Sequence, residues 1–139
     1  ESTPFFKNIR FKDIIGTNVE QAINIIGLAE APPQFIVLED IRMVCKRGLE
    51  ANYVKNLTLR NIELLNVNEK SSFNITCGNQ IVLDNLIGNV TSKDAPVVDV
   101  FRTDGVLLRN CVMPMLGKNK FINLKECSNV KYVGNLFCE

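Results

Sequence analysis

Apolar and polar residues alternate in short runs along the whole chain, and an Asn or Asp closes most of these runs. Alternation with a period of two is typical of β-strands that bury one face. The pattern predicts strands within 8–14, 35–41, 56–62, 80–86, 105–111 and, in a degenerate form, 129–135. In the first five, the Asp or Asn stands at positions 13, 40, 61, 85 and 110, so the unit repeats every 21 to 27 residues.

A second series of apolar pairs lies between these segments. Its members are Ile23/Ile25, Leu49/Ala51, Phe73/Ile75, Val98/Val100 and Ile122/Leu124. The steps between successive pairs are 26, 24, 25 and 24 residues. Two independent series with the same period indicate one structural unit that is repeated along the chain.

The repeated unit predicts a coiled chain. Three short strands per unit, with no helical stretch, cannot form a βαβ crossover, yet they recur at a fixed length. In a parallel β-helix, equivalent strands stack about 4.8 Å apart and inward apolar residues form continuous ladders. We therefore expect an all-β, parallel β-helix of five to six rungs that forms a single domain over residues 1–139. The expected inward ladder is Ile14, Ile41, Ile62, Leu86 and Cys111, and the expected corner column of mutually bonded side chains is Asp13, Asp40, Asn61, Asn85 and Asn110.

The rival interpretation is a leucine-rich repeat, whose period of about 20–29 residues overlaps this one. Leucine-rich repeats place two residues between the last strand Leu and the Asn, whereas one intervenes in Leu59-Arg60-Asn61. That repeat also has no counterpart of the second strand series. A left-handed hexapeptide helix is excluded because no six-residue period is visible.

Three runs, at 3–14, 20–28 and 36–41, resemble the C-terminal coils of bacterial polygalacturonase-like enzymes, glycoside hydrolase family 28. The resemblance covers most of the chain and is clearest from 3 to 65. It implies a right-handed β-helix that forms the C-terminal part of a longer, secreted or periplasmic hydrolase. Such enzymes hydrolyse α-galacturonide linkages in pectin with inversion, using a cluster of aspartates on one strand face.

The chain departs from this family at the family's catalytic motifs. The signatures N-T-D, D-D, G-H-G and R-I-K do not occur, and the sequence contains no His. The run Arg102-Thr103-Asp104-Gly105 imitates the first signature, but the repeat aligns Asp104 with Lys55 and Asn79 in a tight turn. We therefore expect no catalytic residue in this chain and expect the catalytic rungs to lie elsewhere in the parent protein.

Composition supports strands and excludes several partners. Fourteen Val and 13 Ile favour pleated strands, and 17 Asn suit turns and left-handed backbone. The net charge of +1 comes from scattered charges, so we expect no nucleic-acid partner. No apolar run approaches the roughly 20 residues of a membrane span, so we expect no membrane partner.

The cysteines do not suggest a metal site. None of the five belongs to a C-x-x-C motif, and His is missing, so we expect neither a metal nor another cofactor. Cys45, Cys77 and Cys111 fall on inward positions and are expected to be buried thiols. For Cys127 and Cys138 two outcomes stay open, a disulfide that closes the last rung or free thiols.

The candidate substrate-binding residues form one outward column in the second strand series: Asn24, Glu50, Asn74, Asp99 and Asn123. Stacked amides and carboxylates offer hydrogen-bond partners to successive hydroxyls of an extended glycan. Carboxylates would repel a galacturonate chain, so the Asn positions and the neighbouring Lys46 and Arg102 are better candidates for direct contact. The expected partner is a polysaccharide, pectin or polygalacturonate, bound through the parent protein.

Two other functions stay open. A carbohydrate-binding or structural β-helix of the adhesin or tailspike kind would need no catalytic rungs. Independent catalysis would use Glu50 and Asp99, which lie two rungs and about 9.6 Å apart. Inverting glycosidases separate their carboxyl groups by about 6.5–9.5 Å. No second carboxylate crowds Glu50 or Asp99, so neither is an evident proton donor.

The N-terminal end of the predicted coil has no cap. An open terminal rung presents unpaired strand edges and uncovered core, and nothing before Phe5 resembles a capping segment. We therefore expect the isolated chain to self-associate through the end that carries Phe5 and Phe6.

Overall fold

The computed structural model describes residues 6–66, 70–88, 95–114 and 121–138. These residues form β-strands joined by turns, and none of them is helical. The strands are β1 (Lys7–Ile26), β2 (Gln34–Asn52), β3 (Lys55–Asn66), β4 (Phe73–Thr76), β5 (Asn79–Gly88), β6 (Val98–Phe101), β7 (Asp104–Arg109), β8 (Val112–Pro114), β9 (Ile122–Lys125), β10 (Ser128–Val133) and β11 (Leu136–Cys138).

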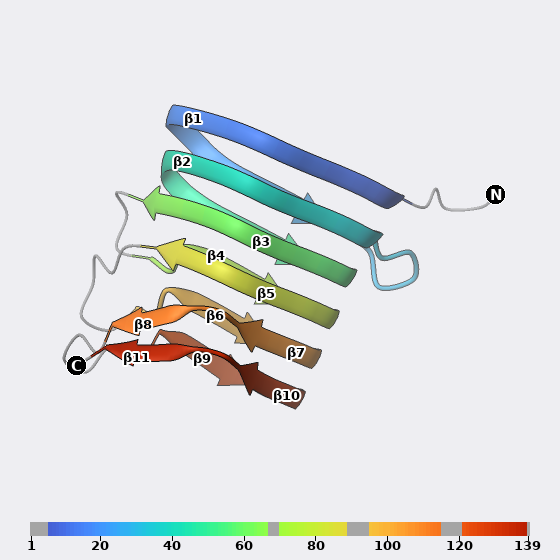
Figure 1. The fold of residues 1–139 in the computed structure, drawn as a ribbon. Helices are drawn as coiled ribbons and strands as arrows, with labels where there is room; N and C mark the ends of the chain where they lie inside the picture. The colour runs from blue at the N-terminus through green and yellow to red at the C-terminus, as the bar shows by residue number, and fades with distance from the viewer. Residues whose placement is uncertain (1–5, 67–69, 89–94, 115–120, 139) are drawn as a thin grey trace.

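All strand pairs are parallel, and each strand pairs with its equivalent one coil further along the chain. The main sheet has the order β10-β7-β5-β3-β2-β4-β6-β9, β1 pairs with β2, and β8 pairs with β11. Figure 1 shows the resulting stack, with β1 at one end and β9, β10 and β11 at the other. The fold is an all-β parallel solenoid of about five turns, as the repeat predicted.

The register confirms both series of apolar residues. In the first series, Ile62 pairs with Ile41 on one side and with Leu86 on the other. In the second, Phe73 lies between Leu49 and Val98. One period of the sequence therefore corresponds to one turn of the coil.

The first two coils differ from the expected set of short strands. β1 and β2 run through the corner as single strands of 20 and 19 residues, and their pairing continues to Asn52 after a shift between Gly16 and Val19. β3 and β5 also run through their corner residues, over 12 and 10 residues, and the remaining strands have three to six residues each.

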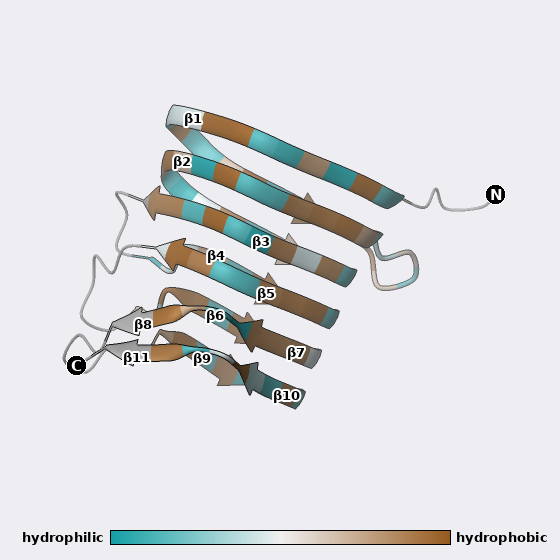
Figure 2. Cartoon of the chain, in the orientation of Figure 1, coloured by the Kyte–Doolittle hydropathy of each residue, from teal (hydrophilic) through white to brown (hydrophobic). Residues whose placement is uncertain are grey.

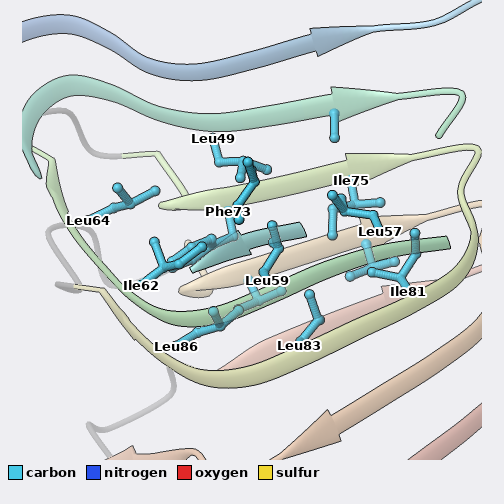
Figure 3. Packing of buried hydrophobic residues seen from close by; sticks show 14 of the residues in the cluster. Leu49, Leu57, Leu59, Ile62, Leu64, Phe73, Ile75, Ile81, Leu83 and Leu86 are labelled. Atoms are coloured by element: carbon cyan, nitrogen blue, oxygen red, sulfur yellow. The ribbon is translucent and has the colours of Figure 1, made fainter. Parts of the chain in front are cut away.

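The core fills the interior of the coils. Figure 2 shows hydrophobic and hydrophilic residues alternating along β1, β2 and β3. The inward side chains of Leu57, Leu59 and Phe73 are fully buried, and Figure 3 shows them projecting into the space that the coils enclose. Burial of this kind is the main favourable contribution to folding, about 25 cal/mol per Å² of apolar surface.

The cysteines follow the inward pattern only in part. Cys45 and Cys111 are buried, as expected, and burial raises the pKa of both thiols. Cys77 was expected inside but is half-buried, because it adopts a left-handed φ of 56° at the end of β4 and turns out of the ladder. Cys127 is a free thiol that donates to the carbonyl of Lys125, so no disulfide with Cys138 is formed.

The corner column forms as predicted over three coils. All five of its residues have φ between 52° and 59°. Asn61 Nδ2 donates to Asp40 Oδ1 at 3.2 Å, and Asn85 Nδ2 donates to Asn61 Oδ1 at 2.9 Å. Asn110 departs from this ladder, because its Nδ2 donates to Asp84 Oδ1 at 3.0 Å. Asp84 is the more attractive acceptor because it is a carboxylate.

Candidate functional site

The predicted column stacks on one outer face of the coils. The register pairs Asn24 with Glu50, Glu50 with Asn74, Asn74 with Asp99, and Asp99 with Asn123. Each of these residues lies between two inward apolar residues of its strand, so each side chain points outward. Asn24 and Asn123 are exposed, and the other three are half-buried.

A polar cleft of about 330 Å³ opens at the middle of this face, where β2 and β4 pair. It contains two members of the column, Glu50 and Asn74. Its full lining is Arg47, Gly48, Glu50, Asn52, Lys70, Ser71, Asn74 and Thr76. Asn24, Asp99 and Asn123 do not line it, so the column is not one continuous site.

A close approach between two coils shapes one end of the cleft. A Cβ on Gly48 would lie 2.0 Å from the carbonyl oxygen of Ser72, so only glycine fits there. The amide of Leu49 donates to the same oxygen at 2.8 Å. The chain entering β4 is therefore held directly against β2, which places Ser71 and Arg47 at the edge of the cleft.

Asn74 is fixed by hydrogen bonds to the backbone. Its Nδ2 donates to the carbonyl of Ser71 at 2.9 Å and to that of Leu49 at 3.4 Å. These bonds use both amide protons and leave Oδ1 as the atom available to a ligand. Asn74 thus holds the entrance of β4 in place, a role that sequence reasoning did not identify.

The two basic residues named from the sequence lie elsewhere on the surface. Lys46 Nζ is 3.5 Å from Glu20 Oε2 and does not line the cleft. Arg102 Nε is 3.2 Å from Glu126 Oε2, and its guanidinium lies 4.9 Å from the ring centre of Phe101. The cleft takes its positive charge from other residues, Arg47 and Lys70.

The far end of the column is internally paired. Asn123 Nδ2 donates to Asp99 Oδ1 at 3.0 Å. Asp99 is separated from Glu50 by the whole of β4 and lies outside the cleft. The register therefore leaves Glu50 and Asp99 two rungs apart on this face, with Asn74 between them.

Asp104 occupies the turn that the repeat assigned to it. It stands in register between Asn79 and Ser128. Ser128 Oγ donates to its Oδ1 at 2.7 Å and Asn129 Nδ2 donates to the same atom at 2.6 Å. These hydrogen bonds, that from Ser128 first, lower the pKa of Asp104 and hold it as a turn-stabilising carboxylate.

The cleft offers binding groups and little acid–base chemistry. Its hydroxyls and amides are Ser71, Thr76, Asn52 and Asn74, and its one carboxylate is Glu50. Among the described residues, Arg47 forms no ion pair, and no group of three or more His, Cys, Asp or Glu could hold a metal ion. Such a set of groups suits hydroxyls together with an anionic group.

Sequence reasoning missed most of the cleft. Asn52 and Thr76 lie two residues after Glu50 and Asn74 on the same strands, so extending the alternation by one step would have found them. Arg47 and Ser71 could not be found in this way, because the close approach of Gly48 to the Ser72 backbone, which joins two coils, lies beside them at the cleft.

Comparisons with known proteins support the fold. No family model matches the chain, and no curated protein matches it. Among solved structures, it is similar to one described as a "putative glycosyl hydrolase" from Parabacteroides merdae, with a TM-score of 0.57 and 9% sequence identity. The match covers 95% of this chain and 75% of that one. At this identity the likeness establishes a shared β-solenoid architecture.

Proposed function

We propose that this chain is a non-catalytic β-helix portion of a pectin-degrading, polygalacturonase-like hydrolase, and that its polar cleft contributes to binding the polysaccharide. Three observations support the proposal. The coil motifs resemble glycoside hydrolase family 28, the solenoid is similar to that of a protein described as a "putative glycosyl hydrolase", and the family's catalytic signatures do not occur in the sequence.

The observation that carries the proposal is the composition of the cleft. Arg47 and Lys70 supply two positive charges, which suit the carboxylates of an acidic glycan. Ser71, Thr76 and the Oδ1 atom of Asn74 suit its hydroxyls. Glu50 opposes an acidic ligand, so the anionic groups are expected to bind on the Arg47 side.

A structural β-helix is the second candidate, and hydrogen bonding within the column favours it. The side-chain amide of Asn74 donates hydrogen bonds to backbone carbonyls, and that of Asn123 donates one to the carboxylate of Asp99. Such bonds strengthen the stack of coils without any ligand. A structural solenoid of this kind would bind polygalacturonate no better than it binds a neutral glucan.

Binding by the isolated chain separates the two candidates. We expect polygalacturonate oligosaccharides to bind, a neutral glucan of equal length not to bind, and Arg47→Ala to weaken binding about tenfold, the effect of one lost charge-assisted hydrogen bond. Calorimetric titration measures both. Arg42→Ala is the matched control, because Arg42 is exposed and pairs with Glu63 away from the cleft.

Two results would contradict the proposal. Equal affinities of the parent chain and Arg47→Ala would remove the cleft as the binding site. Release of reducing sugar from polygalacturonate above a buffer blank would show that the chain is catalytic by itself.

A further inference from the structure

A groove of about 750 Å³ crosses the solenoid on a face that the polar cleft does not share. Its floor is a column of outward side chains on strands that lie side by side in Figure 1: Val37 on β2, Thr58 on β3, Val82 on β5 and Leu107 on β7. Each of these side chains is half-buried. On β2 the corner residue Asp40 separates this floor from the segment that lines the cleft. The groove is therefore a second candidate site.

One rim of the groove carries residues with left-handed backbone. They stand two positions before each floor residue, with φ between 54° and 86°: Phe35, Asn56, Gln80 and Gly105. A Cβ on Gly105 would lie 3.0 Å from Cδ of Gln80, so glycine leaves room there for the Gln80 amide. The rim thus presents amide groups in two adjacent coils, about 4.8 Å apart. Amides can both donate hydrogen bonds to a ligand and accept them from it.

The middle of the groove carries no charge. The charged residues of its lining are Arg10 on β1 and Lys131 on β10, outside the strands β2 to β7. The next outward column over those strands consists of ion pairs among Glu39, Arg60, Asp84 and Arg109. Among the described residues, a ligand that lies over β2 to β7 therefore meets no unpaired counter-charge. Charge complementarity favours an uncharged ligand.

Phe35 is the unusual member of the rim. An aromatic residue with a φ of 57° is strained, and this ring is 50% exposed although it lines the groove. Strained backbone of this kind concentrates at functional sites. The flat face of an exposed aromatic ring suits the CH groups on one face of a pyranose ring. Phe35 is therefore well placed for a stacking contact with a sugar.

The arrangement of the strands argues against a peptide ligand. β2, β3, β5 and β7 each pair on both edges, so they offer no free edge to which an extended peptide could add. A peptide also advances by only about 3.4 Å per residue, whereas the coils repeat at about 4.8 Å. A pyranose ring advances an extended glycan by about one coil spacing. Successive rings would therefore meet successive coils.

We propose that the groove binds a galacturonan chain whose carboxyl groups are methyl esters, laid across the coils from β2 to β7. The inference rests on the proposed function, which makes a galacturonan the ligand of this chain. Esterification removes the charge for which the groove has no partner, and it adds a methyl group that Val37, Val82 and Leu107 can cover. A glucan carries a hydroxymethyl group instead, whose hydroxyl would lie over these side chains without a hydrogen-bond partner.

Exchanging the ring of Phe35 tests the proposal. In calorimetric titration, methyl-esterified galacturonan oligosaccharides long enough to cross four coils are expected to bind the parent chain. They should bind Phe35→Asn about tenfold more weakly, the effect of one lost aromatic contact. Asn at this φ relieves backbone strain, so the loss would not reflect unfolding. Phe35→Tyr keeps the ring and should bind like the parent. Tyr53→Asn is the matched control, because Tyr53 is an exposed aromatic residue with a φ of 54° outside the groove.

A second variant tests the floor. Val82→Thr replaces one methyl group by a hydroxyl and gives this position the residue type of its neighbour Thr58. It should keep the fold and weaken binding of the esterified chain several-fold, because less apolar surface then covers the ester methyl.

De-esterified oligosaccharides from the same preparation separate the groove from the cleft. Phe35→Asn should leave their affinity unchanged. Arg47→Ala should weaken their binding and leave that of the esterified chain unchanged. Added salt should weaken binding of the acidic chain only.

Three results would overturn the inference: no binding of the esterified chain, equal affinities of the parent and Phe35→Asn for it, or a loss of its binding in Arg47→Ala. Binding of the esterified chain that depends on Phe35, without any binding of the acidic chain, would instead contradict the proposed role of the cleft and support that of the groove.

Discussion

At the residue scale, the turns of this solenoid depend on left-handed backbone. Fifteen non-glycine residues in the described ranges have positive φ, and nine of them are Asn or Asp. These two residue types tolerate that conformation better than other side chains do, which explains the abundance of Asn in the sequence. Phe35, Tyr53 and Arg102 adopt it as well, at a cost in free energy of about 1–2 kcal/mol each.

Relieving this strain should stabilise the protein. Phe35 has a φ of 57°, its ring is 50% exposed, and its equivalents Asn8 and Asn56 are asparagines with the same φ. Phe35→Asn is expected to raise the free energy of unfolding by about 1 kcal/mol. Urea unfolding measures it, with Phe35→Leu as the control that removes the ring but keeps the strain. If Phe35→Asn lowered the free energy of unfolding while Phe35→Leu did not, the result would show that Asn does not relieve the backbone strain at this position.

A second residue-scale prediction concerns pH. Burial disfavours ionisation of Asp84, but hydrogen bonds from Asn110, Arg109 and Arg60 outweigh it and lower its pKa. The resulting stabilisation is complete above the unfolded-state pKa of about 3.9 and is lost as pH falls through the lower folded-state pKa. Asp84→Asn is therefore expected to cost about 1–3 kcal/mol at pH 7 and much less in acid.

Urea unfolding at a series of pH values between about 6 and about 3 would measure this effect. Asp13→Asn is the control, because Asp13 is exposed at the corner of the first coil. A difference between Asp84→Asn and the parent that stays constant over this pH range would contradict the assignment.

At the scale of elements, burial in a ladder depends on the coil and not on the residue type. Ile9 on β1 and Ile81 on β5 occupy the same inward column, two coils of the stack lying between their strands. Ile81 is 1% exposed, whereas Ile9 is only partly buried, because no strand of the described residues pairs with the outer edge of β1. Identical side chains therefore contribute differently to stability.

Truncation of the two isoleucines should show this difference. Ile81→Ala is expected to lower the free energy of unfolding by about 2–5 kcal/mol, and Ile9→Ala by less than about 2 kcal/mol. Both should be measured at protein concentrations low enough to keep the chain monomeric. Equal losses would mean that β1 is covered in solution under those conditions.

At the scale of the whole molecule, the structure is a stack of similar coils in which each strand pairs with its equivalent in the next coil. The same inward columns run from β1 to β10, so adjacent coils stabilise one another, and among the described residues the first and last coils pair on one side. Positive and negative side chains also alternate from coil to coil. Arg60 and Arg109 form ion pairs with Asp84 from either side, and Arg60 Nη1 lies 3.6 Å from Glu39 Oε2. Alternating charges in adjacent coils thus reinforce the stack, and the polar cleft lies beside the close approach of Gly48 to Ser72.

The sequence by itself determined the period, the inward ladders and the corner positions. These features are local, since alternation by two and tolerance of positive φ belong to a few adjacent residues. Only the tertiary structure decided which polar groups meet: Arg47 and not Lys46 at the cleft, Asn74 on the carbonyl of Ser71, and Asn110 on Asp84. Those contacts depend on bends in the backbone and on diagonal reach between coils, and a one-dimensional repeat contains no information about either.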